Sequence, residues 1–281
     1  MYKRCLLCVG AWGRLRNVKR GCLFLAFFVV GCATADLQTA KEMIRQQKYY
    51  NAMELYLAFV REHPDHRRAP EALLEVGNIQ QTMLNEPRQA LGTYQKLAGM
   101  YPINRYTLLA QRRIAEIYKN NLTDYQQAIV EYEKLIQGAP KDPAAAQYQL
   151  EIARCYTQLH NYAQASIEYQ TLLSKYPNAE NLDEVYFQLG NNAYIGGKYR
   201  EAISAYRTVD ERYPNSEFRS EAIFGLATAY EEQEDWAEAR KQYLRVAQNY
   251  PQPKVVEIRL QGLAKREKKK ETVSAGAHLR Q

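Results

Sequence analysis

The chain has 281 residues, of which 46% are hydrophobic, an ordinary composition for one or two globular domains. Its formal net charge of +7 lies at the two ends: residues 1–31 hold six basic residues and no acid, and residues 259–281 hold seven basic and two acidic residues. The body between them, residues 32–258, carries a net charge close to −4. No basic stripe runs through that body, which argues against nucleic acid as the main partner.

The N-terminal segment has the pattern of a signal peptide. Basic residues precede GCLFLAFFVV (21–30), an apolar run of ten residues that is too short to span a bilayer but suits a signal-peptide h-region. A short buried helix is the alternative interpretation. Val18-Lys19-Arg20 would make an ordinary basic n-region, so Met1 and Val18 both stay open as the first translated residue.

The apolar run ends in Val29-Val30-Gly31-Cys32, which resembles the bacterial lipobox. The resemblance implies that residues 1–31 are a lipoprotein signal peptide and that Cys32 is lipidated, which attaches the mature protein to a membrane. Ala33 follows in place of the aspartate that retains such proteins at the inner membrane. We therefore expect a lipid-anchored protein on the periplasmic face of the outer membrane.

Only one cysteine, Cys155, lies in the body of the mature chain. Cys5, Cys8 and Cys22 fall in the segment expected to be removed, so the Cys5-x-x-Cys8 pair is not expected to do redox or metal chemistry. We expect Cys155 to be a buried thiol that packs as a small hydrophobic residue.

An Ala-x3-Tyr pattern recurs six times through the body, at intervals of 37 or 38 residues. A proline follows each tyrosine eight residues later. Another small residue precedes each alanine by twelve or thirteen residues. The pairs are Ala52/Tyr56, Ala90/Tyr94, Ala128/Tyr132, Ala165/Tyr169, Ala202/Tyr206 and Ala239/Tyr243, the prolines are Pro64, Pro102, Pro140, Pro177, Pro214 and Pro251, and the small residues are Ala40, Gly77, Ala115, Ala153, Gly190 and Ala227.

This pattern resembles the tetratricopeptide repeat, in which Leu-Gly-x2-Tyr, Ala-x3-Phe/Tyr and Pro follow one another in each unit. The resemblance implies an all-α protein, a right-handed superhelical solenoid of six helix hairpins. Small residues let the two helices of a hairpin cross closely, and each tyrosine fills the gap between its own hairpin and the next. The expected repeats are residues 33–68, 69–105, 106–143, 144–180, 181–217 and 218–253, within a mature region of 32–253.

Local signals agree with these hairpins. Asp124, Asn161 and Asp235 stand four residues before the alanine, where a side-chain cap of the second helix is expected. Proline ends each second helix because it disfavours helical geometry in the residue before it. The second and third units carry one extra residue in the turn between their helices. After Pro251, residues 254–270 are expected to form a capping helix, and residues 271–281 a disordered tail.

Long-period units that close with Tyr-Pro resemble those of outer-membrane lipoproteins of the BamD (YfiO) and CpoB (YbgF) types. This resemblance implies a scaffold for protein–protein interactions in the cell envelope, with outer-membrane protein assembly as the leading interpretation. A CpoB-like adaptor of the Tol-Pal and peptidoglycan machinery is the alternative, and a peptidoglycan-modifying enzyme a third. The lysine-rich run KREKKK (265–270) is interpreted as a solvated helix end, with anionic lipid or cell-wall polymer as the alternative contact.

The repeat resemblance also implies where partners bind. The concave face of such a solenoid is lined by first-helix residues one, four and five places beyond the small residue, which suit an extended peptide or a partner helix. These positions lie off the packing positions, so alanine there is expected to weaken binding without weakening the fold. The residues are Asn78, Gln81, Glu116, Lys119, Arg154, Gln158, Asn191, Tyr194, Thr228 and Glu231.

No catalytic motif stands in the mature region: G-x-S-x-G, HExxH, a Walker loop and paired CxxC zinc spacing are all missing from the sequence. His63-Pro-Asp-His66 lacks a nearby third ligand and is not expected to bind a metal. We therefore expect a protein that is not an enzyme and that uses no cofactor and no metal.

Overall fold

The computed structural model describes residues 36–278, and the regular structure in that part of the chain is helical, so the expected all-α fold is confirmed. Cys32 and the apolar run before it lie outside the described residues. No helix within residues 36–278 combines the length and the apolar composition that crossing a bilayer requires.

The described residues fall into two compact units, which divide between residues 113 and 114. A helix over residues 36–45 precedes the labelled elements. These are α2 (Tyr49–Glu62), α3 (Ala69–Asn78), η1 (Ile79–Met83), α4 (Pro87–Met100), α5 (Arg105–Asn120), α6 (Tyr125–Gly138), α7 (Ala145–Gln158), α8 (Tyr162–Lys175), α9 (Leu182–Ile195), α10 (Tyr199–Arg212), α11 (Arg219–Glu232), α12 (Trp236–Val246) and α13 (Pro253–His278).

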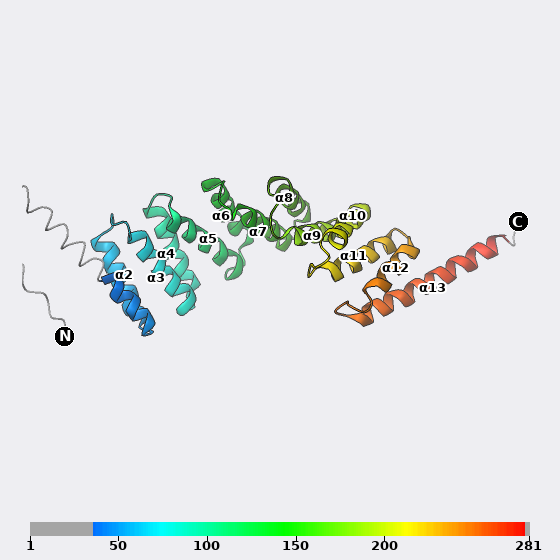
Figure 1. The fold of residues 1–281 in the computed structure, drawn as a ribbon, viewed down its shortest axis with the longest axis horizontal. Coiled ribbons are helices and arrows are strands. Elements are labelled where there is room, and N and C mark those ends of the chain that lie inside the picture. Colours follow the sequence, from blue (N-terminus) through cyan, green and yellow to red (C-terminus); the bar gives the residue numbers. More distant parts are fainter. Residues whose placement is uncertain (1–35, 279–281) are drawn as a thin grey trace, which may run out of the picture. The chain divides into compact units, whose positions relative to one another are not determined.

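Helices that follow one another in the sequence pack against one another within each unit (Figure 1). In the first unit α2 contacts α3, and α3 contacts α4. In the second unit each helix from α6 to α13 contacts the next, and α9 also contacts α11, the first helix of the following hairpin. Serial hairpins of this kind bury a continuous core, because no single hairpin can cover its own apolar face.

The repeat alanines and tyrosines form that core. All six alanines are fully buried, and the six tyrosines are at most 3% exposed. Tyr206 shows why small residues are needed beside its ring: a Cβ atom added to Gly190, on the same hairpin, would lie 2.5 Å from Tyr206 Cε1. A Cβ atom added to Gly225, on the next hairpin, would lie 2.6 Å from Tyr206 Cζ. The ring therefore fills the space between two neighbouring hairpins, as the repeat pattern predicts.

Tyr132, the repeat tyrosine of the third hairpin, differs from Tyr206 in what it meets on the next hairpin. It is 3% exposed, so its predicted place in the core is confirmed. The position that corresponds to Gly225, two repeat intervals earlier, is Glu151, which is not a small residue. The ring of Tyr132 stacks on Tyr148 of α7 instead, with ring centroids 6.1 Å apart and 26° between the ring planes. At Tyr132, stacking between two rings thus replaces the close approach of a glycine.

Each turn between the two helices of a hairpin contains one residue with positive φ. Five of the six are not glycine: Gln47, Asn85, Thr123, His160 and Glu234, with φ between 52° and 60°. The fifth hairpin has Gly197, with φ of 70°. The left-handed conformation lets the chain reverse within a few residues, and it is unfavourable for residues other than glycine and asparagine.

The two hairpins with an extra residue accommodate it differently. In the third, four residues instead of three separate α5 from α6. In the second, the first helix ends in the π-helical turn η1, where the N–H of Leu84 donates to the carbonyl of Ile79 at 3.0 Å. Such an i→i+5 turn takes up one inserted residue without breaking the helix.

The expected N-caps are confirmed. The side chains of Asp124, Asn161 and Asp235 accept hydrogen bonds from the N–H groups of Gln127, Gln164 and Glu238, at 3.1, 3.2 and 3.2 Å. Each bond satisfies one of the backbone donors that a helix start leaves open.

The C-terminal helix is longer than expected. Instead of ending at residue 270, α13 continues to His278, so the expected disordered tail is wrong over residues 271–278. Between Pro253 and His278 the sequence contains no further proline, and residues 264–271, AKREKKKE, are good helix formers. Nothing local stops the helix at the end of the lysine run.

Candidate functional site

The second unit has a groove of about 510 Å³ bordered by α5, α7 and α9 and by the turn between α5 and α6. Three of the predicted concave-face residues line it. They are Lys119, Arg154 and Gln158, and the lining is completed by Asn120, Thr123, Tyr125, Cys155, Glu184 and Gln188.

Ion pairs between consecutive first helices cross this groove. Lys119 on α5 pairs with Glu151 on α7. On the other side, Arg154 Nε donates to Glu184 Oε1 on α9 at 2.7 Å, and a second nitrogen of the same guanidinium pairs with the other oxygen of Glu184. Arg154 Nη1 also donates to Glu151 Oε1 at 2.7 Å. The four charges therefore compensate one another, and the bidentate geometry fixes the orientation of the guanidinium.

Both carboxylates of this network are buried, Glu151 at 8% and Glu184 at 9% exposure. Burial by itself would lower the pKa of Arg154, but the hydrogen bonds and charges of Glu184 and Glu151 outweigh it and raise that pKa. The guanidinium thus stays charged throughout the accessible pH range. A buried pair of this kind contributes more to specificity of packing than to net stability, and losing one partner leaves a costly unpaired charge.

Cys155 lies beneath the groove and is 1% exposed. Burial raises the pKa of its thiol to about 12, so the sulfur is protonated at neutral pH and is a poor nucleophile. The expectation of a buried thiol is confirmed.

Four of the predicted concave-face residues instead receive the hydroxyl groups of repeat tyrosines. In the first unit, Tyr94 donates to Asn78 Oδ1 at 2.9 Å and also lies 3.2 Å from Gln81 Oε1. In the second, Tyr206 donates to Asn191 Oδ1 at 2.8 Å.

The fourth of these residues is Glu231, which is 6% exposed and accepts a hydrogen bond from Tyr243 at 2.9 Å. Burial, followed by the charge of Glu231, raises the pKa of Tyr243. Arg266 lies 2.9 Å from the other oxygen of this carboxylate. Both carboxylate oxygens of Glu231 therefore contact groups of the protein itself.

The expectation that these positions could be changed without affecting the fold is therefore wrong for Asn78, Asn191, Arg154 and Glu231. Asn78 and Asn191 directly follow the small residue of their helix, and Glu231 stands four residues after it. Each of these three residues lies within hydrogen-bonding reach of a repeat tyrosine. A buried tyrosine hydroxyl needs a polar partner, and these positions supply it. Sequence spacing identified the face of the helix on which these residues lie. It did not show which of their side chains form hydrogen bonds or ion pairs within the protein.

The remaining predicted residues are placed as follows. Tyr194 makes a long hydrogen bond of 3.5 Å to Glu232 and packs against Tyr199, with ring centroids 5.5 Å apart. The Thr228 hydroxyl donates to the carbonyl of Gly225 on its own helix at 2.8 Å. Glu116 is half-buried on α5.

Sequence reasoning missed Glu151 and Glu184, the acidic partners of the groove residues Lys119 and Arg154. Both stand before the small residue of their helix, at positions that the repeat pattern does not single out. The available signal was charge alone: each carboxylate follows its basic partner on the preceding first helix by 32 or 30 residues, which is not the repeat interval. Gln188, which accepts a hydrogen bond from Asn191 at 3.2 Å, was missed for the same reason.

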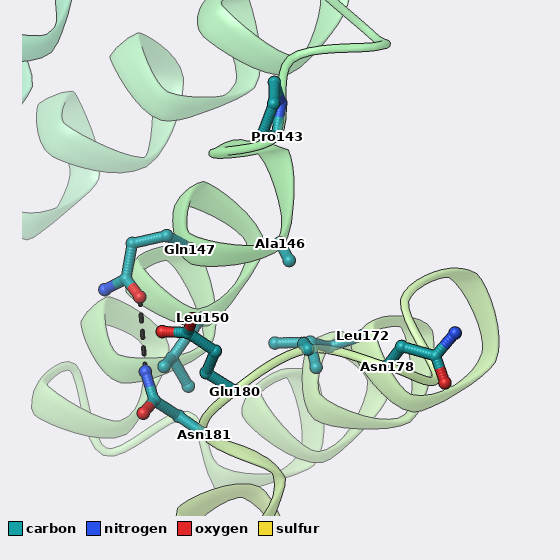
Figure 2. A pocket seen from close by; sticks show the side chains of 9 residues that line it. Pro143, Ala146, Gln147, Leu150, Leu172, Asn178, Glu180 and Asn181 are labelled. Carbon is teal, nitrogen blue, oxygen red and sulfur yellow. Dashed lines mark hydrogen bonds between the residues drawn. The ribbon is translucent and has the colours of Figure 1, made fainter.

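A second hollow, of about 330 Å³, lies where the start of α7 meets the turn between α8 and α9 (Figure 2). Leu150 and Leu172 lie at its edge, and Asn181 donates to Gln147 Oε1 at 3.4 Å across it. This is the turn that lengthens the repeat beyond the usual period, and its lining contains only one ionisable side chain, Glu180. It offers little for recognition compared with the groove at Arg154.

The histidines of the turn after α2 have contacts of their own. His66 Nδ1 accepts a hydrogen bond from the N–H of Arg68 at 3.1 Å. The rings of His63 and His66 pack against Phe59, with centroid distances of 5.5 and 5.2 Å. Within residues 36–269 no three His, Cys, Asp or Glu side chains are grouped so that they could hold a metal ion.

Two family models, both described as tetratricopeptide repeat, match residues 122–189 and 187–252. No curated protein matches the chain. Solved structures do. A tetratricopeptide-repeat protein from Parabacteroides merdae is 18% identical, with 84% of this chain and 88% of that chain covered and a TM-score of 0.53.

Two further structures share the architecture. PilW, described as a widely conserved type IV pilus biogenesis factor, is 14% identical, with 80% of this chain and 98% of that chain covered and a TM-score of 0.51. YrrB, described as a protein with an unusual peptide-binding site, is 16% identical, with 73% and 97% covered and a TM-score of 0.55. At these identities the likeness concerns the fold. The family matches, the shared fold and the buried alanine–tyrosine hairpins together identify the chain as a tetratricopeptide-repeat protein.

Proposed function

We propose that this chain is a scaffold that binds an extended segment of a partner protein in the groove between α5, α7 and α9. The observation that carries the proposal is that some residues at the groove are held in ion pairs within the protein, whereas others are exposed. Lys119 and Arg154 are neutralised by Glu151 and Glu184, whereas Asn120 and Gln158 line the same groove and are exposed.

Exposed amide side chains suit an extended peptide. Each offers one acceptor and two donors, the complement of the N–H and C=O groups that an extended backbone presents. The ion-paired wall beside them is held rigidly, so little side-chain entropy is lost there when a ligand binds. The description of YrrB as having a peptide-binding site supports this use of the fold.

The proposed location is the periplasmic face of the outer membrane, with the chain anchored through a lipid on Cys32. The lipobox-like Val29-Val30-Gly31-Cys32 after a ten-residue apolar run supports the anchor. In that compartment the proposed role is assembly of outer-membrane proteins, as the resemblance to BamD-type lipoproteins implies. The description of PilW as a pilus biogenesis factor agrees with a scaffold role in assembly.

Filling the groove tests the binding site. Asn120→Trp with Gln158→Trp should abolish capture of the main partner from detergent-solubilised envelopes and leave the thermal midpoint nearly unchanged, because both side chains are exposed. The matched control is Gln170→Trp, on the exposed surface of the second helix α8. Equal capture by the groove variant and the control would refute binding in this groove.

The captured proteins test the role. Barrel-assembly subunits would support assembly of outer-membrane proteins, whereas Pal-type proteins would point to the CpoB-like adaptor instead. The anchor has a separate test: Cys32→Ser should abolish lipid labelling and release the protein into the soluble fraction or leave an uncleaved precursor. Unchanged lipid labelling of that variant would contradict the anchor.

A further inference from the structure

The last helix, α13, contains a short sequence that also occurs in α11, the first helix of the sixth hairpin. Gly225-Leu226-Ala227 on α11 recurs as Gly262-Leu263-Ala264 on α13, at the repeat interval of 37 residues. Ala264 also stands thirteen residues after Pro251, the interval that separates Pro214 from Ala227. By sequence, α13 therefore matches the first helix of a seventh repeat.

Packing agrees with this assignment. Leu263 is fully buried, as Leu226 is at 2% exposure. Val256 and Leu263 join Ala227 and Tyr243 in one hydrophobic cluster that ties α13 to α11 and α12. The helix therefore caps the last complete hairpin by taking the place that the next first helix would occupy.

Side-chain contacts place α13 in series with the other first helices. Lys119–Glu151 links α5 to α7, and Arg154–Glu184 links α7 to α9. The Tyr194–Glu232 contact links α9 to α11. The series continues from α11 to α13, because Glu231 lies 3.6 Å from Arg259 and 2.9 Å from Arg266. These contacts form one row along the second unit.

Aligning α13 with the other first helices shows which of its lysines occupy groove-facing places. The groove-facing places one, four and five beyond the small residue are Lys265, Lys268 and Lys269. Lys265 and Lys268 are exposed, and no side chain within residues 36–269 pairs with either. At Arg154 the charges are compensated, whereas no carboxylate of residues 36–269 pairs with the exposed ammonium groups of Lys265 and Lys268.

We propose that the binding surface continues from α11 onto α13, where Lys265 and Lys268 bind an acidic segment of the partner protein. This inference rests on the proposed function, since it assigns a chemistry to one end of the same surface. Ammonium groups recognise carboxylates as point charges without fixed geometry, so the acidic residues need no particular order.

An anionic membrane is the less favoured ligand for these lysines. A helix that lies on a membrane inserts its apolar face between the lipids. The apolar residues Val256 and Leu263 are buried against the protein and are not available for that. The lysines are also in line with the groove-facing row rather than spread over the outer surface.

The test uses a labelled, amidated oligoglutamate peptide, with an oligoglutamine peptide of the same length as the neutral probe, and the full chain. Lys265→Glu with Lys268→Glu should weaken oligoglutamate binding by about tenfold or more, since each exposed charge contact contributes up to about 1 kcal/mol. The matched control, Lys141→Glu with Lys254→Glu, makes the same change in net charge at two exposed lysines away from the groove-facing row. It should bind oligoglutamate nearly as well as the unchanged chain.

Several outcomes would overturn the inference: no oligoglutamate binding to the unchanged chain, equal binding of both probes, or equal loss in both charge variants. A fourth is binding to phosphatidylglycerol-containing vesicles that depends on Lys265 and Lys268 while oligoglutamate does not bind, which would assign the lysines to a membrane. Partner capture separates this failure from that of the proposed function. Capture lost with the double variant Asn120→Trp, Gln158→Trp but kept with the lysine reversals refutes only the inference, whereas capture kept with that double variant refutes the groove itself.

Discussion

Replacing Gly190 by alanine should destabilise the protein, although alanine is the better helix former. Gly190 lies inside α9, where a Cβ atom would approach Tyr206 Cε1, Cδ1 and Cζ to 2.5, 2.6 and 3.0 Å. The ring cannot move away, because Gly225 holds its other side just as closely. Either the two hairpins separate or Tyr206 leaves its place and loses the 2.8 Å hydrogen bond to Asn191.

The expected magnitude follows from two opposing terms. Overpacking a well-packed site costs about 1–3 kcal/mol, whereas exchanging glycine for alanine inside a helix gains about 1 kcal/mol. The net loss should be about 0–2 kcal/mol, and more if the tyrosine hydrogen bond breaks. The matched control is Gly92→Ala. Gly92 lies on the exposed face of α4, where an added Cβ atom meets nothing within 4 Å. That variant should gain stability by up to about 1 kcal/mol.

Urea unfolding followed by circular dichroism would measure both variants, and hydrogen exchange would locate the change. Weaker protection should be confined to α9, α10 and α11, because repeat proteins transmit changes mainly to their neighbours. In a Tyr206→Leu background, Gly190→Ala should cost less than it does in the unchanged chain, because the smaller side chain leaves room for the Cβ atom. If Gly190→Ala stabilises as much as Gly92→Ala, Tyr206 does not fill the crossing and the account of the repeat core is wrong.

Three further predictions concern the same hairpins. Ala202→Leu should cost about 1–3 kcal/mol, because Ala202 is fully buried at a helix crossing, whereas Glu201→Leu on the exposed side should cost little; equal urea midpoints would contradict this. Thr123→Gly should stabilise by about 1 kcal/mol, because a β-branched residue at φ of 52° is strained, and Gly197→Thr should destabilise by a similar amount in thermal unfolding. Burial raises the pKa of Tyr169 to about 12, so its unfolded form ionises first; the contribution of Tyr169 to stability should be constant below about pH 10 and fall between pH 10 and 12. An equal fall in stability between pH 10 and 12 in Tyr169→Phe would refute that last expectation.

The repeat core was predictable from the sequence because it depends on local chemistry at a fixed interval. A small residue, an alanine and a tyrosine in register specify a close helix crossing and the ring that covers it, and each recurs every 37 or 38 residues. The caps at Asp124, Asn161 and Asp235 depend on hydrogen bonds to residues three positions away, so they too could be placed in advance. Where local signals were absent, prediction failed: the sequence has no stop signal after Lys270, and α13 continues.

The neighbour that each repeat tyrosine meets on the next hairpin was not predictable in the same way. Tyr206 and Tyr132 occupy the same position of the repeat, yet Tyr206 lies against Gly225 and Tyr132 stacks on Tyr148. The interval fixes where the ring stands on its own helix. What it packs against depends on side chains of the following hairpin that lie outside the repeat pattern.

Only the tertiary structure decided which groove-facing side chains are available to a partner. The helical period places Asn191, Arg154 and Gln158 on the same face, yet Asn191 serves the hydroxyl of Tyr206, Arg154 is held by Glu184 thirty residues away, and Gln158 is exposed. Period determines the face on which a side chain lies. Its partner depends on how neighbouring helices are rotated and which rotamers their packing allows, because hydrogen bonds and ion pairs require contact to within a few tenths of an ångström.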